Sequence, residues 1–137
     1  MRSWLIPSLR RAAWAPLTVL AFYAVAAKAL DAYIHYPWLD MPTHFFGGMA
    51  ATYFYLVAAR HALQPALSAA GAIPLLAIGQ TAMTAILWEF LEYLADILFG
   101  TQMVLGSTDI LRDLFFGLAG ALVMLGVDGL NPGARRT

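Results

Sequence analysis

The sequence contains no cysteine and few charged residues. Without cysteine the chain cannot form disulfides, thiolate metal sites or thiol nucleophiles. Charged residues make up 12% of the 137 positions and apolar residues 61%, whereas about one quarter of a soluble domain is charged. The formal net charge is zero and basic runs are missing, which argues against nucleic acid as a partner. The composition predicts a protein of the lipid bilayer, whose chemistry must use oxygen and imidazole groups.

Four apolar stretches are long enough for the roughly 20 residues that a helix needs to cross a bilayer. They are residues 14–35, 42–62, 72–98 and 108–127. Helix-breaking residues separate them, such as Pro37 after the first stretch and Gly100 after the third. We therefore predict an all-α, polytopic membrane protein with a four-transmembrane-helix bundle at residues 14–127. An interfacial N-terminal segment at 1–13 and a tail at 128–137 flank it.

The positions of the arginines predict the orientation. Arginines precede the first stretch, end the second and follow the fourth, namely Arg2, Arg10, Arg11, Arg60, Arg135 and Arg136. The other two loops contain no Lys or Arg. The positive-inside rule then places both termini and the 60–71 loop in the cytoplasm. Arg10 and Arg11 before an apolar run also imitate a secretory signal, but the apolar segment continues to Ile34, beyond a typical signal core.

Small residues gather on two of the predicted helices. These are Gly47, Gly48 and Ala51 on the second, and Gly117, Gly120 and Ala121 on the fourth. Small side chains let helix backbones approach closely in lipid. We interpret these positions as helix contacts.

Seven of the eight carboxylates fall at the predicted outer end, and only Asp128 is predicted to be cytoplasmic. The outer seven are Asp31, Asp40, Glu89, Glu92, Asp96, Asp109 and Asp113. Residues three or four apart share a helix face. The third predicted helix has acids at i, i+3 and i+7, the fourth at i and i+4, and the second places an acid four residues before a histidine. Three helices are thus expected to direct polar groups to one level.

Ionisable groups inside a membrane cost roughly 2.5–3.5 kcal/mol each and usually face the bundle interior. Crowded carboxylates either share protons at raised pKa or bind a cation, and oxygen ligands with one imidazole suit a divalent metal of open identity. The predicted ligands are His44, Glu89, Glu92, Asp109 and Asp113, and the predicted catalytic residues, acting as bases or supporting the ligands, are Asp40 and Asp96.

Each of these residues also has a structural interpretation. The acids of the third and fourth helices could form a proton-sharing network, and His44 could be an interfacial histidine. Asp40 could cap the second helix, while Asp96 could lie in the headgroup layer. Arg112 is either a counter-ion of the neighbouring acids or a phosphate anchor.

Three functions fit the sequence. The first is a metal-dependent membrane enzyme that acts at the outer leaflet on a lipid or lipid-linked substrate. The second is an ion-binding or proton-coupled transporter or an accessory membrane subunit, and the third is a structural membrane scaffold. No nucleophile elbow is present, and the oligomeric state stays open.

Several motifs resemble those of the YjdF-like family of small bacterial inner-membrane proteins. They are Asp40-Met-Pro-Thr-His44-Phe, Trp88-Glu89-Phe-Leu-Glu92, Gly100-Thr-Gln102, Asp109-Ile-Leu-Arg-Asp113 and Gly117-Leu-Ala-Gly120. The similarity covers roughly residues 40–122, and a more distant one is to VanZ-like membrane proteins. The resemblance implies a multi-pass protein of the bacterial cytoplasmic membrane and supports the choice of polar residues, but it implies no particular reaction.

Overall fold

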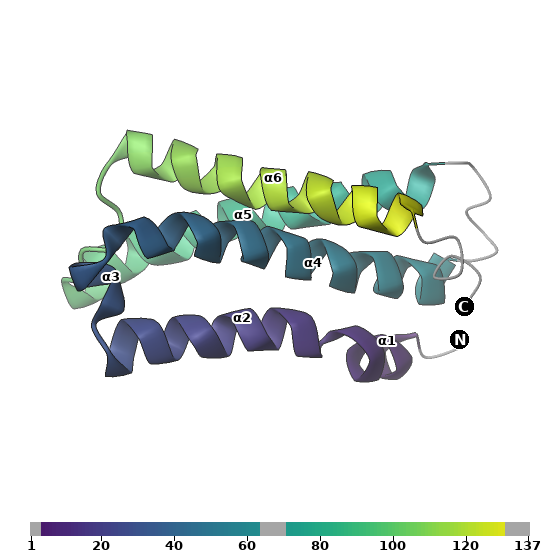
Figure 1. Cartoon of the computed structure of the whole chain (residues 1–137), viewed down its shortest axis with the longest axis horizontal. Coiled ribbons are helices and arrows are strands. Elements are labelled where there is room, and N and C mark those ends of the chain that lie inside the picture. Colours follow the sequence, from purple (N-terminus) through teal and green to yellow (C-terminus); the bar gives the residue numbers. More distant parts are fainter. Residues whose placement is uncertain (1–3, 64–70, 131–137) are drawn as a thin grey trace.

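The computed structural model describes residues 4–63 and 71–130, and over these ranges the chain is all-α with no strand. α2, α4, α5 and α6 lie side by side along the long axis of the molecule (Figure 1). The elements are α1 (Leu5–Ala12), α2 (Trp14–Ala24), the π-helix η1 (Val25–Ala29), α3 (Ala32–His35), the 3-10 helix η2 (Pro37–Leu39), α4 (Asp40–Leu63), α5 (Ala72–Phe99) and α6 (Ser107–Leu130).

Successive long helices run in opposite directions, so the bundle has two distinct ends (Figure 1). One end, here called the α1 end, contains α1, the last turns of α4 and α6 and the first turn of α5. The other, here called the acidic end, contains α3, η2, the first turns of α4 and α6 and the last turns of α5. Most of the predicted 60–71 loop and of the 128–137 tail lies outside the described residues.

The first predicted helix is not continuous. We expected one helix over residues 14–35, but α2 passes into the π-helix η1, and Asp31 adopts a left-handed backbone with φ 46°. A π-turn breaks the regular hydrogen-bond pattern, and Asp tolerates the left-handed conformation better than most residues. The chain therefore turns into α3, where the Tyr33 hydroxyl lies 2.7 Å from Thr43 Oγ1 on α4.

α5 and α6 are long and apolar enough to cross a membrane. Only 22% of the apolar window in each is buried within the bundle, whereas the core helix of a soluble protein buries most of its residues. Exposed Leu, Ile and Phe side chains along both helices therefore suit contact with lipid. α2 and the start of η1 form a shorter apolar helix, and α4 does not pass the same test of length and composition within the described chain.

α4 lies at the centre and packs against α1, α2, α5 and α6. Where α4 crosses α6, the backbones of the two helices are in direct contact. A Cβ added at Gly48 would lie 1.9 Å from the Gly117 carbonyl oxygen. A Cβ added at Gly120 would lie 1.9 Å from the Phe45 carbonyl oxygen. The predicted small-residue contact is thus confirmed at these glycines, and one turn away from it the same crossing brings His44 and Asp113 together.

Polar contacts also fix the α1 end. Arg60 Nη2 donates to Asp128 Oδ2 at 2.6 Å, with both side chains largely buried. Ser8 Oγ lies 3.0 Å from His61 Nδ1. These contacts join α4 to α6 and α1, and they were not predicted from the sequence.

Candidate metal centre

His44 lies between carboxylates of two helices. Its Nε2 is 3.4 Å from Asp40 Oδ1, one turn earlier on α4. Its Nδ1 is 3.9 Å from Glu89 Oε1 on α5. The His44 side chain is only 11% exposed. Its electrostatic environment therefore depends on the neighbouring carboxylates more than on bulk water.

Two groups of side chains could hold a metal ion. Asp40, His44 and Asp113 form one, and His44, Glu89 and Glu92 form the other, with potential ligand atoms within 4.8 Å of one another in each group. The two glutamates are i and i+3 on α5, while Asp113 comes from α6. The structure therefore brings together five of the seven site residues named from the sequence, on three helices.

Two buried carboxylate oxygens in these groups accept no hydrogen bond from any residue that the structure describes. They are Glu89 Oε1 and Asp113 Oδ1, in residues that are 7% and 2% exposed. Burial of a charged or polar group without a partner is costly. Their nearest charged neighbours lie beyond hydrogen-bond distance, with His44 Nδ1 3.9 Å from Glu89 Oε1 and Arg112 Nε 3.8 Å from Asp113 Oδ1. A proton or a bound cation would supply the missing partner of each oxygen.

Asp109 is held apart from the two groups by its own partners. The Arg112 guanidinium donates to Asp109 Oδ1, and the Leu105 backbone N–H donates to Oδ2 at 3.0 Å. Arg112 Nε also lies 3.8 Å from Asp113 Oδ1. Arg112 is thus a counter-ion of the acids on α6, which was one of the two roles considered for it.

Asp96 also lies outside the two groups. Its Oδ1 accepts hydrogen bonds from Thr101 Oγ1 at 2.5 Å and from the Met103 N–H at 2.8 Å, and its Oδ2 accepts from the Val104 N–H at 2.9 Å. These bonds hold the loop that joins α5 to α6. The sequence offered one signal for this role, because Asp96 lies four residues before Gly100, in the last turn before the break after the third predicted stretch.

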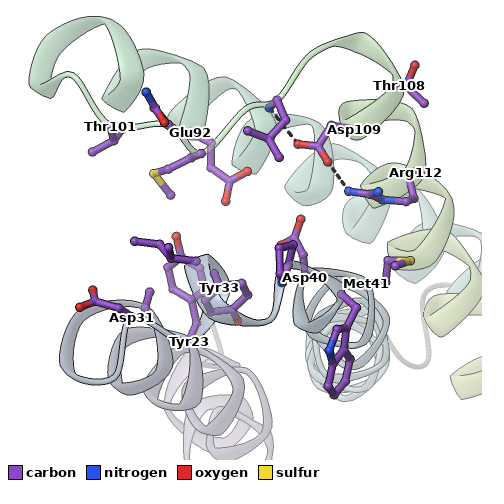
Figure 2. A pocket seen from close by; sticks show the side chains of 17 residues that line it. Tyr23, Asp31, Tyr33, Asp40, Met41, Glu92, Thr101, Thr108, Asp109 and Arg112 are labelled. Carbon is purple, nitrogen blue, oxygen red and sulfur yellow. Dashed lines mark hydrogen bonds and ion pairs between the residues drawn. The ribbon is translucent and has the colours of Figure 1, made fainter.

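A cavity of about 690 Å³ opens beside the candidate metal centre. Figure 2 shows Asp40, Glu92 and Asp109 facing this space from three helices, with Arg112 at its margin. Trp88 Nε1 donates to Glu92 Oε1 at 2.8 Å, a contact that was not among the predictions from the sequence. The i, i+4 spacing of the two residues was the available signal.

The apolar outer faces of α5 and α6 and the polar groups enclosed between the helices define a helical membrane protein. The chain belongs to the family described as "Predicted membrane protein (DUF2238)", whose model matches residues 5–130. That match includes every helix of the structure. Comparisons with curated proteins and with solved structures gave no match. The YjdF-like and VanZ-like resemblances stay predictions.

Proposed function

We propose that the chain crosses the bacterial inner membrane four times, with both termini in the cytoplasm. α2 and α4 lie alongside α5 and α6 (Figure 1), so a bilayer around the latter pair would also enclose the former. Arg10, Arg11 and Arg60 belong to elements at the α1 end, which the positive-inside rule assigns to the cytoplasm. The acidic end then faces the outside.

We further propose that the acidic end binds a divalent metal ion. His44 Nδ1, Glu89 and Glu92 are the ligands in this proposal. A neutral imidazole has one donor and one acceptor nitrogen, and Asp40 lies on the Nε2 side at 3.4 Å. Donation from Nε2 to Asp40 leaves Nδ1 free for the ion, which is the common carboxylate–histidine–metal arrangement.

Asp113 completes the proposed ligand set from α6. The unpartnered oxygens of Glu89 and Asp113 are the observation that carries the proposal, because they lie on different helices around one imidazole. A cation would stabilise both oxygens at once. In this scheme Asp40 orients His44, Asp96 holds the α5–α6 loop, and Asp109 positions Arg112. Carboxylates with one imidazole suit Mn, Mg, Fe or Ca, and Zn with mixed ligands.

The function that fits this site is metal-dependent chemistry on a lipid or lipid-linked substrate at the outer leaflet. A bound ion would polarise an ester or phosphoryl oxygen or activate water. The adjoining cavity of about 690 Å³ falls within the roughly 300–1,000 Å³ of small-molecule sites. It is large enough for a polar headgroup.

Elemental analysis tests the proposal. The protein is purified in detergent, washed with chelator, reloaded with Mn²⁺ and measured beside a Glu89→Ala/Asp113→Ala variant. Asp31→Asn is the matched control, because it removes a carboxylate of the acidic end that belongs to neither group. We expect stoichiometric metal in the wild type and the control and its loss in the double variant.

Wild-type protein that takes up no metal would overturn the proposal and favour a scaffold. If metal binds, turnover of a lipid extract separates an enzyme from an ion carrier. A chelator-sensitive loss of turnover is the result expected for the enzyme.

A further inference from the structure

A second, narrower cavity of about 220 Å³ lies next to the candidate metal centre. Its polar end contains Asp40 and His44. Away from that end its walls are largely apolar, with Val19 and Leu20 on α2 and Ala51 on α4, and α5 adds Thr81 and Thr84. The cavity is thus polar at one end and mostly apolar along the rest.

Small residues leave this space between the helices. Gly47, Gly48 and Ala51 on α4 and Ala85 on α5 line it. α2 and α5 each pack on α4, and they meet at the ring contact of Tyr23 with Trp88, whose centroids are 5.4 Å apart. The cavity is therefore built by the same small-residue face of α4 that lets the helices approach one another.

The two cavities adjoin, because Tyr23 and Asp40 line both. At this boundary Tyr23 also contacts Tyr33, with ring centroids 5.5 Å apart. Tyr23, Tyr33 and Trp88, here called the aromatic collar, thus lie where the larger cavity, which contains the charged side chains, meets the narrow, mostly apolar one. Tyr and Trp favour such boundaries, since each ring has an apolar body and a polar tip.

We propose that the narrow cavity binds one acyl chain of a membrane lipid whose headgroup occupies the larger cavity beside the metal centre. This names the substrate class of the proposed function and rests on it for the position of the headgroup. The aromatic collar would surround the lipid where its head joins its tail. The lipid would reach the site from the surrounding bilayer.

The dimensions and the chemistry of the narrow cavity favour an acyl chain over other occupants. Its volume of about 220 Å³ is below the roughly 300–1,000 Å³ of typical small-molecule sites, and this space suits part of one thin acyl chain. A polypeptide segment would need hydrogen-bond partners for its backbone, and the Val, Leu, Gly and Ala side chains of the wall offer none. The hydroxyls of Thr43, Thr81 and Thr84 also line the cavity, but each already bonds to a helix carbonyl and to a second hydroxyl. A soluble polar ligand would gain nothing from these apolar side chains.

Photo-crosslinking in detergent tests the proposal, with phosphatidylglycerol that carries a diazirine in one acyl chain as the probe. Crosslinked positions are mapped by mass spectrometry in the wild type and in Ala51→Phe and Val19→Phe, which fill the narrow cavity from two helices. Ala21→Phe is the control: it adds the same ring at an exposed position of α2 that does not line the cavity.

We expect crosslinks on the wall of the narrow cavity in the wild type and the control, and at least a tenfold loss in both filled variants. Crosslinks confined to the outer faces of α5 and α6 in the wild type would overturn the proposal even if a filled variant failed to fold. Bound metal is measured on the same samples. Metal without cavity crosslinks refutes the acyl site alone, and cavity crosslinks without metal refute the metal centre alone.

Discussion

A methyl group added at Gly48 should separate α4 from α6. The Cβ of Gly48→Ala would lie 1.9 Å from the Gly117 carbonyl oxygen, which is about 1.5 Å inside the 3.4 Å at which ordinary van der Waals contact begins. The atoms that it meets belong to the backbone, so no side-chain rotation can relieve the overlap. The helices themselves must move apart.

The energetic cost follows from that displacement. Overpacking a tight contact usually costs about 1–3 kcal/mol, and we expect Gly48→Ala to reach at least the upper part of this range. Movement of α6 would also draw Asp113 away from His44, because both lie one turn from the crossing. Mn²⁺ affinity should therefore fall together with stability.

Unfolding in mixed micelles, followed by tryptophan fluorescence, measures the change in stability. Gly126→Ala is the matched control, since it lies on α6 and its added Cβ would have no neighbour within 4 Å. Ala favours a helix over Gly by up to about 1 kcal/mol, so the control should be neutral or slightly more stable. If Gly48→Ala were as stable as Gly126→Ala, the backbone contact between α4 and α6 would be refuted.

Three further predictions concern single contacts. Arg60→Ala should lower the free energy of unfolding by about 3–5 kcal/mol, because it leaves Asp128 buried without its partner. Arg60→Met combined with Asp128→Leu should restore most of this stability. An unchanged free energy of unfolding in Arg60→Ala would contradict the pairing. Asp96→Asn should speed hydrogen exchange in the α5–α6 loop, whose amides bond to this carboxylate, while bound Mn²⁺ stays the same; unchanged exchange would mean that the loop is held by other contacts. Asp40→Asn should weaken Mn²⁺ binding about 10–100-fold, the usual effect of losing the group that orients a metal-binding histidine, and calorimetry showing equal affinity would exclude that role for Asp40 toward His44.

Periodicity and composition predicted much of the fold. Long apolar stretches gave the positions of α4, α5 and α6, because apolar runs that end at Pro or Gly residues mark helices and their boundaries. The close approach of Gly48 to Gly117 was predictable from the small residues on the two helices. The break at Asp31 could not, since a π-turn and a left-handed residue depend on how α3 packs over the acidic end.

The candidate site was predictable where it lies on helices and unpredictable where it involves loops. Spacing placed His44, Glu89 and Asp113 at one level, and the structure brings them together. The partners of Asp96 and Asp109 depend on loop backbone N–H groups, whose directions no periodicity predicts. The Arg60–Asp128 pair joins residues 68 positions apart, so only the tertiary fold could reveal it.

The central claim is that carboxylates from separate helices share one cation with His44. Anomalous diffraction from crystals soaked in Mn²⁺ tests it most directly, because the scattering locates the ion itself. We expect one strong peak within bonding distance of His44 Nδ1, of the Glu89 and Glu92 carboxylates on α5 and of the Asp113 carboxylate on α6. A fully soaked crystal with no peak there, or with manganese only on exposed surface acids, would contradict it.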